Sequence, residues 1–118
     1  MEVRIDHDMK HTLKQINDTL ETLAKDAPEY MEAFICLVKQ AEKEGVLSVK
    51  TKELISIAIS VITHCIPCIA FHIKSAIDEG ASRQEILEAG LVAGLMGGGP
   101  AVAHLRYVID ACDQFSAK

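Results

Sequence analysis

Apolar residues recur every three or four positions along most of this 118-residue chain, which is the pattern of amphipathic helices. The first such stretch, residues 8–25, has its apolar stripe at Leu13, Ile16, Leu20 and Leu23. A second helix is expected to begin at Pro28, which suits a first helical turn, and to end at Gly45. Its buried stripe would consist of Met31, Phe34, Ile35 and Val38. These two helices make up residues 1–46, the N-terminal part of the predicted fold.

Two further helices are predicted around the middle of the chain. The third spans about residues 50–62, and the fourth begins near Pro67 and ends at Gly80, where a glycine follows two acidic residues. The break between them falls in an otherwise apolar segment, residues 54–73, which carries no charged side chain. We expect this segment to be buried in protein and not in a membrane, because Pro67 and two histidines interrupt it.

The last two helices follow a recognisable start signal. Ser82 and Glu85 have the spacing of a capping box, so a fifth helix should begin there and run to about residue 96. A sixth should follow the glycine run at 97–99 and continue to about residue 115. Because no segment alternates as a strand does, the chain is predicted to be all-α, a single domain (1–118) of about six helices with its functional core in residues 47–118.

Composition and charge narrow the choice of partners. Apolar residues make up 49% of the chain and aromatic residues only 4%, so the chain has more apolar surface than so short a sequence can bury, which predicts a homo-oligomer. The formal net charge is −5, and the twelve Lys and Arg residues are scattered, so we expect no nucleic-acid partner. The first ten residues lack the apolar segment of a secretory signal, which predicts a cytoplasmic protein. Four cysteines in that compartment indicate catalysis or metal binding.

The candidate chemistry lies between Glu53 and His72. Cys65 and Cys68 have Cys-x-x-Cys spacing, at which a disulfide can form and open without moving the fold. Cys68 is expected in the first turn of a helix, which favours a thiolate, and His72 follows four residues later on the same face. A hydrogen bond from His72 to Glu53 would fix the tautomer of the ring and help it to take a proton from a cysteine. The alternative for Glu53 is a solvated charge in a first helical turn.

Two structural interpretations of the cysteine motif stay open on the residues alone. Cys65, Cys68 and His72 offer three ligands for a structural zinc ion, although no second pair with zinc-finger spacing follows. The two cysteines could also be inert buried thiols.

The other histidines and cysteines lie outside this pattern. His64 is expected to fill the junction between two helices, and His104 to lie in the core or at a subunit contact. Cys36 and Cys112 are expected to be ordinary buried or half-buried thiols.

The chain has Glu53, eleven intervening residues and then Cys65-x-x-Cys68-x-x-x-His72, followed by Glu-Gly-Ala-Ser and a glycine-rich turn. This pattern resembles the AhpD-like (alkylhydroperoxidase D) branch of the carboxymuconolactone decarboxylase family. The resemblance covers about residues 50–107. It implies an all-helical fold that assembles as trimers or hexamers, with a redox site between helices near a subunit boundary. It also implies reduction of hydroperoxides or disulfides with no cofactor other than a redox-active Cys65–Cys68 disulfide.

The resemblance further implies a role for each site residue. Cys68 would be the reactive, peroxide-facing thiol and Cys65 the resolving thiol, while His72 and Glu53 would form the proton relay that activates Cys68. Thioredoxin-type chemistry would instead make Cys65 the attacking thiol. The position of His72, one helical turn from Cys68, favours the family assignment.

The predicted function is therefore that of an antioxidant thiol-disulfide oxidoreductase with peroxidase (peroxiredoxin) activity or disulfide reductase activity, restored by an unidentified dithiol electron donor. A second hypothesis is a decarboxylase-like lyase for a small carboxylated lactone, with His72 and Glu53 as acid and base. The two thiols count against it, because the decarboxylase branch generally lacks the cysteine pair. A third is a non-catalytic, zinc-stabilised helical module. The oxidant, the donor and the choice between trimer and hexamer stay open.

Overall fold

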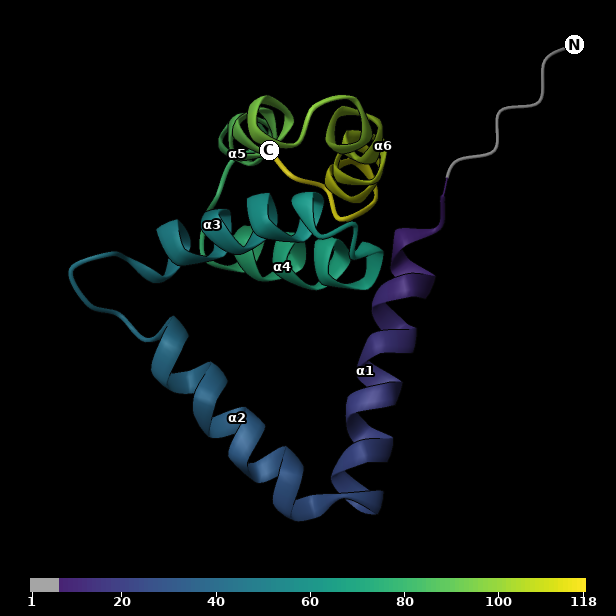
Figure 1. Cartoon of the computed structure of the whole chain (residues 1–118), viewed down its shortest axis with the longest axis vertical. Helices are drawn as coiled ribbons and strands as arrows, with labels where there is room; N and C mark the ends of the chain where they lie inside the picture. Colours follow the sequence, from purple (N-terminus) through teal and green to yellow (C-terminus); the bar gives the residue numbers. More distant parts are fainter. Residues whose placement is uncertain (1–6) are drawn as a thin grey trace, which may run out of the picture.

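The computed structural model describes residues 7–118, which form six helices and no strand (Figure 1). The helices are α1 (Met9–Asp26), α2 (Pro28–Glu42), α3 (Val49–Ile62), α4 (Ile66–Asp78), α5 (Arg83–Gly97) and α6 (Gly99–Gln114). The all-α prediction is confirmed, and most helix ends lie within one or two residues of the predicted positions. Within the described range, none of the helices combines the length and the apolar character that a membrane crossing requires.

Side-chain caps fix where the later helices begin. The Ser48 hydroxyl accepts a hydrogen bond from the backbone N–H of Thr51 at the start of α3. At the start of α5, the predicted capping box is present: Ser82 accepts from the Glu85 N–H (3.1 Å), and Glu85 accepts from the Ser82 N–H (2.9 Å). Each cap satisfies backbone donors that a helix cannot pair internally.

The core is built by helices α3 to α6, with the first turn of α1 attached to it (Figure 1). Its largest fully buried side chains are Met9, Ile57, Val61, Ile69, Ile73, Ile86, Val108 and Cys112. Met9 ties α1 to the end of α6, because its backbone N–H donates to Oε1 of Gln114 (2.6 Å) and Nε2 of the same Gln114 donates to the His7 carbonyl (2.6 Å). The bundle α3–α6 is therefore closed at one end by the start of α1.

Helices α1 and α2 form a V-shaped hairpin that projects from this bundle (Figure 1). The predicted burial of the α2 stripe is wrong for most of its residues. Met31 is buried, but Phe34 and Ile35 are 41% and 43% exposed, and Val38 is half-buried. Helix α2 also ends at Glu42 and not at Gly45, because Lys43 already has extended backbone angles. An apolar stripe indicates which face of a helix avoids water, but not whether the same chain covers it.

A single glycine sets the turn between α5 and α6. Gly98 has φ 70° and ψ −155°, a backbone conformation that residues with a Cβ rarely adopt. A Cβ built on Gly98 would meet no atom within 4 Å, so only the backbone conformation opposes a larger residue there. The neighbouring Gly99 has equal space but belongs to α6.

We expect Gly98→Ala to lower the free energy of unfolding by about 1–3 kcal/mol, the usual cost of a residue held in a disfavoured backbone region. Gly99→Ala is the matched control and should be neutral or slightly stabilising, because alanine is the better helix former. Denaturant unfolding of both variants at one protein concentration measures the difference. Equal effects of the two substitutions would show that backbone strain at Gly98 is not what shapes this turn.

Candidate functional site

The turn between α3 and α4 places the cysteine pair at the start of α4. The backbone N–H of Cys65 donates to the carbonyl of Ser60 (3.0 Å), and His64 within the turn has φ 56°. Cys65 is the N-cap residue of α4, since its Sγ accepts a hydrogen bond from the backbone N–H of Cys68 (3.2 Å). The two residues form a disulfide, with their Cα atoms 5.2 Å apart. Both sulfurs therefore lie at a helix N-terminus, where backbone dipoles favour a thiolate once the bond is reduced.

Glu53 and His72 form a hydrogen-bonded pair between α3 and α4. Nδ1 of His72 lies 2.7 Å from Oε2 of Glu53, and the Glu53 side chain is only 3% exposed. A carboxylate this deeply buried is costly without a partner, and the imidazole supplies one. The hydrogen bond that the sequence analysis expected between these two residues is present.

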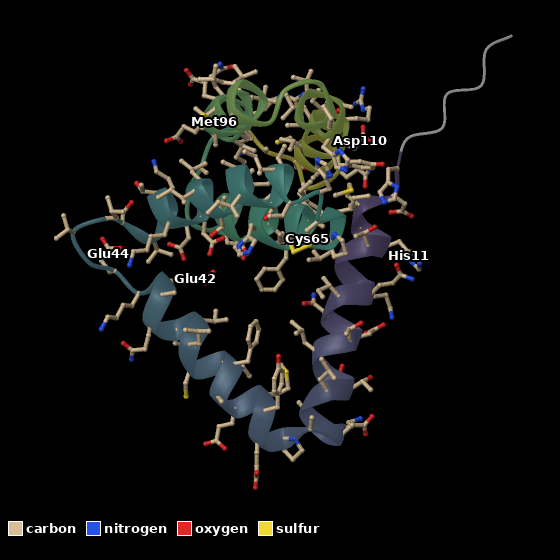
Figure 2. All side chains as sticks on the ribbon, in the orientation of Figure 1. His11, Glu42, Glu44, Cys65, Met96 and Asp110 are labelled. Atoms are coloured by element: carbon tan, nitrogen blue, oxygen red, sulfur yellow. A yellow bond between two sulfur atoms is a disulfide. The ribbon has the colours of Figure 1, made fainter. Side chains whose placement is uncertain are left out.

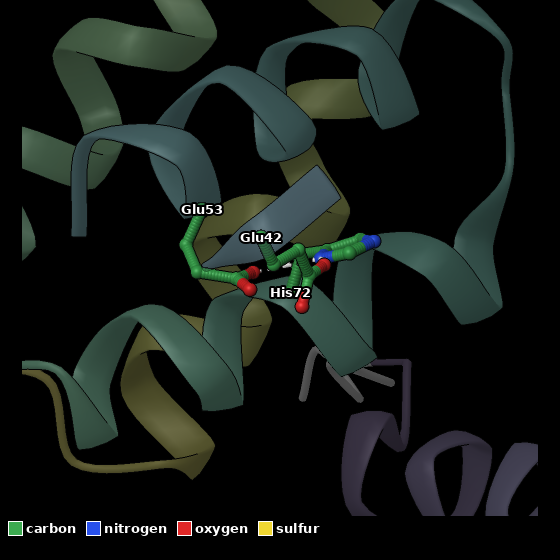
Figure 3. Close-up of side chains that lie close together, drawn as sticks. All are labelled: Glu42, Glu53 and His72. Atoms are coloured by element: carbon green, nitrogen blue, oxygen red, sulfur yellow. Dashed lines mark hydrogen bonds and ion pairs between the residues drawn. The ribbon is translucent and has the colours of Figure 1, made fainter. Parts of the chain in front are cut away.

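This hydrogen bond determines which nitrogen of His72 is available for chemistry. A carboxylate can only accept, so Nδ1 donates and the neutral ring carries its lone pair on Nε2. Figure 3 shows the second ring nitrogen pointing away from both neighbouring carboxylates. His72 follows Cys68 by one helical turn on α4, so the two side chains share one face of that helix.

A second carboxylate, Glu42, approaches the same imidazole from the end of α2 (Figure 3). Its Oε1 lies 3.9 Å from Nδ1 of His72, and its side chain is 28% exposed. Burial and the negative charge of Glu53 raise the pKa of Glu42, and the neighbouring His72 acts in the opposite direction. This residue was not among the predicted site residues, because nothing in the sequence around Glu42 indicates that the end of α2 lies beside His72.

A cavity of about 380 Å³ opens beside this group of residues. Glu42 and His72 line it together with Lys52 and Ser56, and the rest of its wall is formed by Leu37, Val38, Ala41 and Ile55. Glu53 is not part of this lining, so it contacts the cavity only through its neighbours. The cavity therefore offers a mostly apolar space with polar groups at the imidazole.

Glu42, Glu53 and His72 are also the one group of potential metal ligands that lie within 4.8 Å of one another among residues 7–118. However, Nδ1 of His72 already carries the proton of the hydrogen bond to Glu53, and a cation would have to displace it. The three side chains therefore form one group coupled by a hydrogen bond and by charge. Cys65 and Cys68, the other ligands considered for zinc, are joined in a disulfide and offer no thiolate in this form.

The remaining histidines and cysteines lie away from this group. The rings of His64 and His104 stack, with centroids 4.5 Å apart, and Nδ1 of His104 donates to the carbonyl of Pro100 (3.0 Å). Cys112 is buried in α6, and burial raises the pKa of its thiol to about 11, so it stays protonated. Cys36 lies exposed on α2, which corrects the expectation of a buried or half-buried thiol.

Comparison with known sequences identifies the family to which this chain belongs. A sequence model of the carboxymuconolactone decarboxylase family matches residues 28–111. An uncharacterized protein of Cupriavidus necator is 32% identical over 110 residues, which cover 93% of this chain and 97% of the relative. The uncharacterized protein 4 in the cox locus of Paracoccus denitrificans is 39% identical over 83 residues, covering 70% of this chain and 75% of the relative.

Solved structures agree with this assignment. A carboxymuconolactone decarboxylase family protein from Legionella pneumophila is 38% identical, with a TM-score of 0.88 over 92% of this chain and 96% of its own. A family protein from Thermotoga maritima, with a suggested involvement in an antioxidative response, is 29% identical, with a TM-score of 0.79 over 88% of this chain and 89% of its own. The chain therefore belongs to the carboxymuconolactone decarboxylase family, and its Cys-x-x-Cys pair is consistent with the AhpD-like branch.

Proposed function

We propose that this protein is a thiol-disulfide oxidoreductase that cycles between the Cys65/Cys68 dithiol and their disulfide and reduces hydroperoxides or disulfides. The observation that carries the proposal is the cysteine pair at the start of α4 with His72 one turn further along, its ring oriented by the buried Glu53. The suggested antioxidative role of the Thermotoga maritima relative supports this choice. Cys65 lies on the side of the bundle that faces the α1–α2 hairpin (Figure 2).

In the proposed cycle, Nε2 of His72 takes the proton of the Cys68 thiol, and the Glu53 carboxylate stabilises the imidazolium that forms. The thiolate attacks the terminal oxygen of a hydroperoxide and the O–O bond breaks, leaving a sulfenic acid on Cys68. The alkoxide takes the proton from His72 and leaves as an alcohol. The Cys65 thiol then attacks the sulfenic sulfur, water leaves, and the disulfide forms. Two electrons have passed from the thiols to the peroxide, and a dithiol donor returns them.

Assignment of Cys68 as the attacking thiol depends on His72. The helix N-terminus acts on both sulfurs, and the Cys68 N–H even donates to the sulfur of Cys65. Only the imidazole distinguishes them, because His72 shares a helical face with Cys68. With a small disulfide as oxidant, the same thiolate attacks a sulfur, one thiol leaves, and Cys65 releases the second.

We expect one equivalent of an alkyl hydroperoxide or of a small disulfide to convert the reduced Cys65–Cys68 peptide to its disulfide within a short exposure. Peptide-mapped mass spectrometry measures the conversion, and the faster oxidant distinguishes a peroxidase from a disulfide reductase. The chain contains its own controls, since Cys36 is an exposed thiol and Cys112 a buried one. Oxidation of the pair no faster than oxidation of Cys36 would contradict the proposal.

Serine variants separate the roles of the two thiols in the same assay. Cys68→Ser should abolish turnover, whereas Cys65→Ser should leave one stoichiometric oxidation of Cys68 that a sulfenic-acid reagent traps. The reverse pattern would make Cys65 the attacking thiol.

We expect Glu53→Gln to slow alkylation of Cys68 in the reduced protein by about a hundredfold, the lower end of what a positioned acid–base group supplies. Glutamine can still accept the hydrogen bond from Nδ1 of His72, so this variant removes the charge and keeps the tautomer. The pH profile of iodoacetamide alkylation measures the effect, with Glu88→Gln on the exposed surface of α5 as control. An unchanged profile would remove Glu53 from the mechanism.

We also propose that the chain assembles into a homo-oligomer, a trimer or a hexamer by family resemblance. Besides the α2 face, α3 and α5 expose large apolar side chains, which we call the apolar patch: Ile55, Ile59, Ile62, Leu91, Val92, Leu95 and Met96. Met96 lies on the outer side of α5, away from the bundle core (Figure 2). Leu95 and Met96 are 81% and 74% exposed, which is unusual for large apolar side chains. A second copy of this chain, which carries the same apolar surfaces, is the occupant that we propose.

Leu95→Glu should reduce the assembly to smaller species, because it places a charge at the most exposed residue of the apolar patch, whereas the fold should tolerate it at an exposed position. Light scattering after size-exclusion chromatography gives the mass, which should equal three or six chains for the unmodified protein. Gln84→Glu, also exposed on α5 but outside the patch, is the charge-matched control. A protein that is monomeric at micromolar concentration would refute the proposed assembly.

A further inference from the structure

The role of Glu42 is not accounted for by the relay of Glu53 and His72. Two carboxylates converge on one nitrogen, with Oε2 of Glu53 at 2.7 Å and Oε1 of Glu42 at 3.9 Å from Nδ1 of His72. They come from different helices, α3 and α2, and differ in exposure, at 3% and 28% of the side chain. The more exposed carboxylate is therefore the one that can gain or lose a proton with the least change in its surroundings.

The cavity strengthens this distinction between the two carboxylates. Glu42 and His72 line it, whereas Glu53 does not. Water in the cavity can exchange protons with Glu42 directly. Because Glu42 is within 4 Å of the ring, each change in its protonation changes the electrostatic potential at His72.

We propose that Glu42 is a third proton-binding member of the relay, whose ionisation controls how readily His72 accepts the proton of Cys68. This inference rests on the proposed redox function. Glu42 acts through His72 and touches neither thiol, so it is a positioning residue for the proton. When Glu42 is ionised, its negative charge stabilises the imidazolium and with it the thiolate, and when Glu42 is protonated this support is lost.

The other charged groups around Glu42 are consistent with this role. From α3, Glu53 repels its negative charge, and Lys52 lines the cavity, although its Nζ donates to the Lys43 carbonyl at 2.7 Å. From α4, His72 attracts it. Burial and Glu53 together raise the pKa of Glu42, so the change in thiol reactivity should fall above the usual titration range of a glutamate.

The test is the pH profile of iodoacetamide alkylation of Cys68 in the reduced full-length protein, with and without Glu42→Gln. At a pH well below the pKa of Glu42, the carboxyl is protonated in the unmodified protein, so the two rates should agree. As the pH rises through the pKa of Glu42, the unmodified protein should become about tenfold faster than the variant. Glu32→Gln removes a charge from the exposed surface of the same helix and should keep the original profile.

Glu42→Asp keeps an ionisable group and should keep the pH step, which distinguishes proton binding from a structural role. Folding of the glutamine variant is expected to be preserved. A raised pKa in the folded state means that the ionised carboxylate costs stability as the pH rises through that pKa, and glutamine carries no such charge.

Failure of this inference and failure of the proposed function give different results. If Cys68 of the unmodified protein is alkylated no faster than the exposed Cys36 at any pH, the thiol is not activated and the redox proposal is wrong. If Cys68 is activated but Glu42→Gln follows the unmodified profile at every pH, the redox proposal stands and the role of Glu42 is refuted.

Discussion

The buried carboxylate of Glu53 is the constraint on which the site depends. A side chain that is 3% exposed cannot keep a negative charge without a partner, and Nδ1 of His72 provides one at 2.7 Å. The same hydrogen bond holds α3 against α4 and leaves Nε2 of the ring as the basic nitrogen. Removal of the imidazole would leave the buried carboxylate of Glu53 unsatisfied. The packing of these two helices and the chemistry of the imidazole therefore cannot vary independently.

The start of α4 combines structure and chemistry in a similar way. Cys65 is the N-cap residue, so its sulfur occupies the place that a serine or aspartate oxygen would usually take. The Cys65 sulfur is therefore both the cap of the helix that carries His72 and one half of the disulfide. The interval between cap and imidazole is fixed by helix geometry, which makes the spacing of this motif informative in the sequence.

The features that could be predicted from the sequence depend on local interactions. The capping box of Ser82 and Glu85 and the helix boundaries follow from interactions within a few residues, and most of them were predicted correctly. The exposure of Phe34 was not, because a periodic stripe contains no information on which surface covers it. Glu42 could not be found either, since its approach to His72 requires the α2–α3 connection to fold the hairpin back toward α4.

Helix α2 connects the two features that the sequence did not predict. Met31 is its one buried residue among those described and lies near the turn to α1, so α2 meets the bundle mainly through its C-terminal end. Its C-terminal residue, Glu42, lies 3.9 Å from His72, while the middle of the helix exposes an apolar face. In the proposed assembly, another copy of the chain covers that face and so limits the movement of α2. Because the interaction of two charges depends on their separation, a contact that fixes α2 also fixes the influence of Glu42 on the thiols. Self-association and thiol reactivity are then coupled through a single helix.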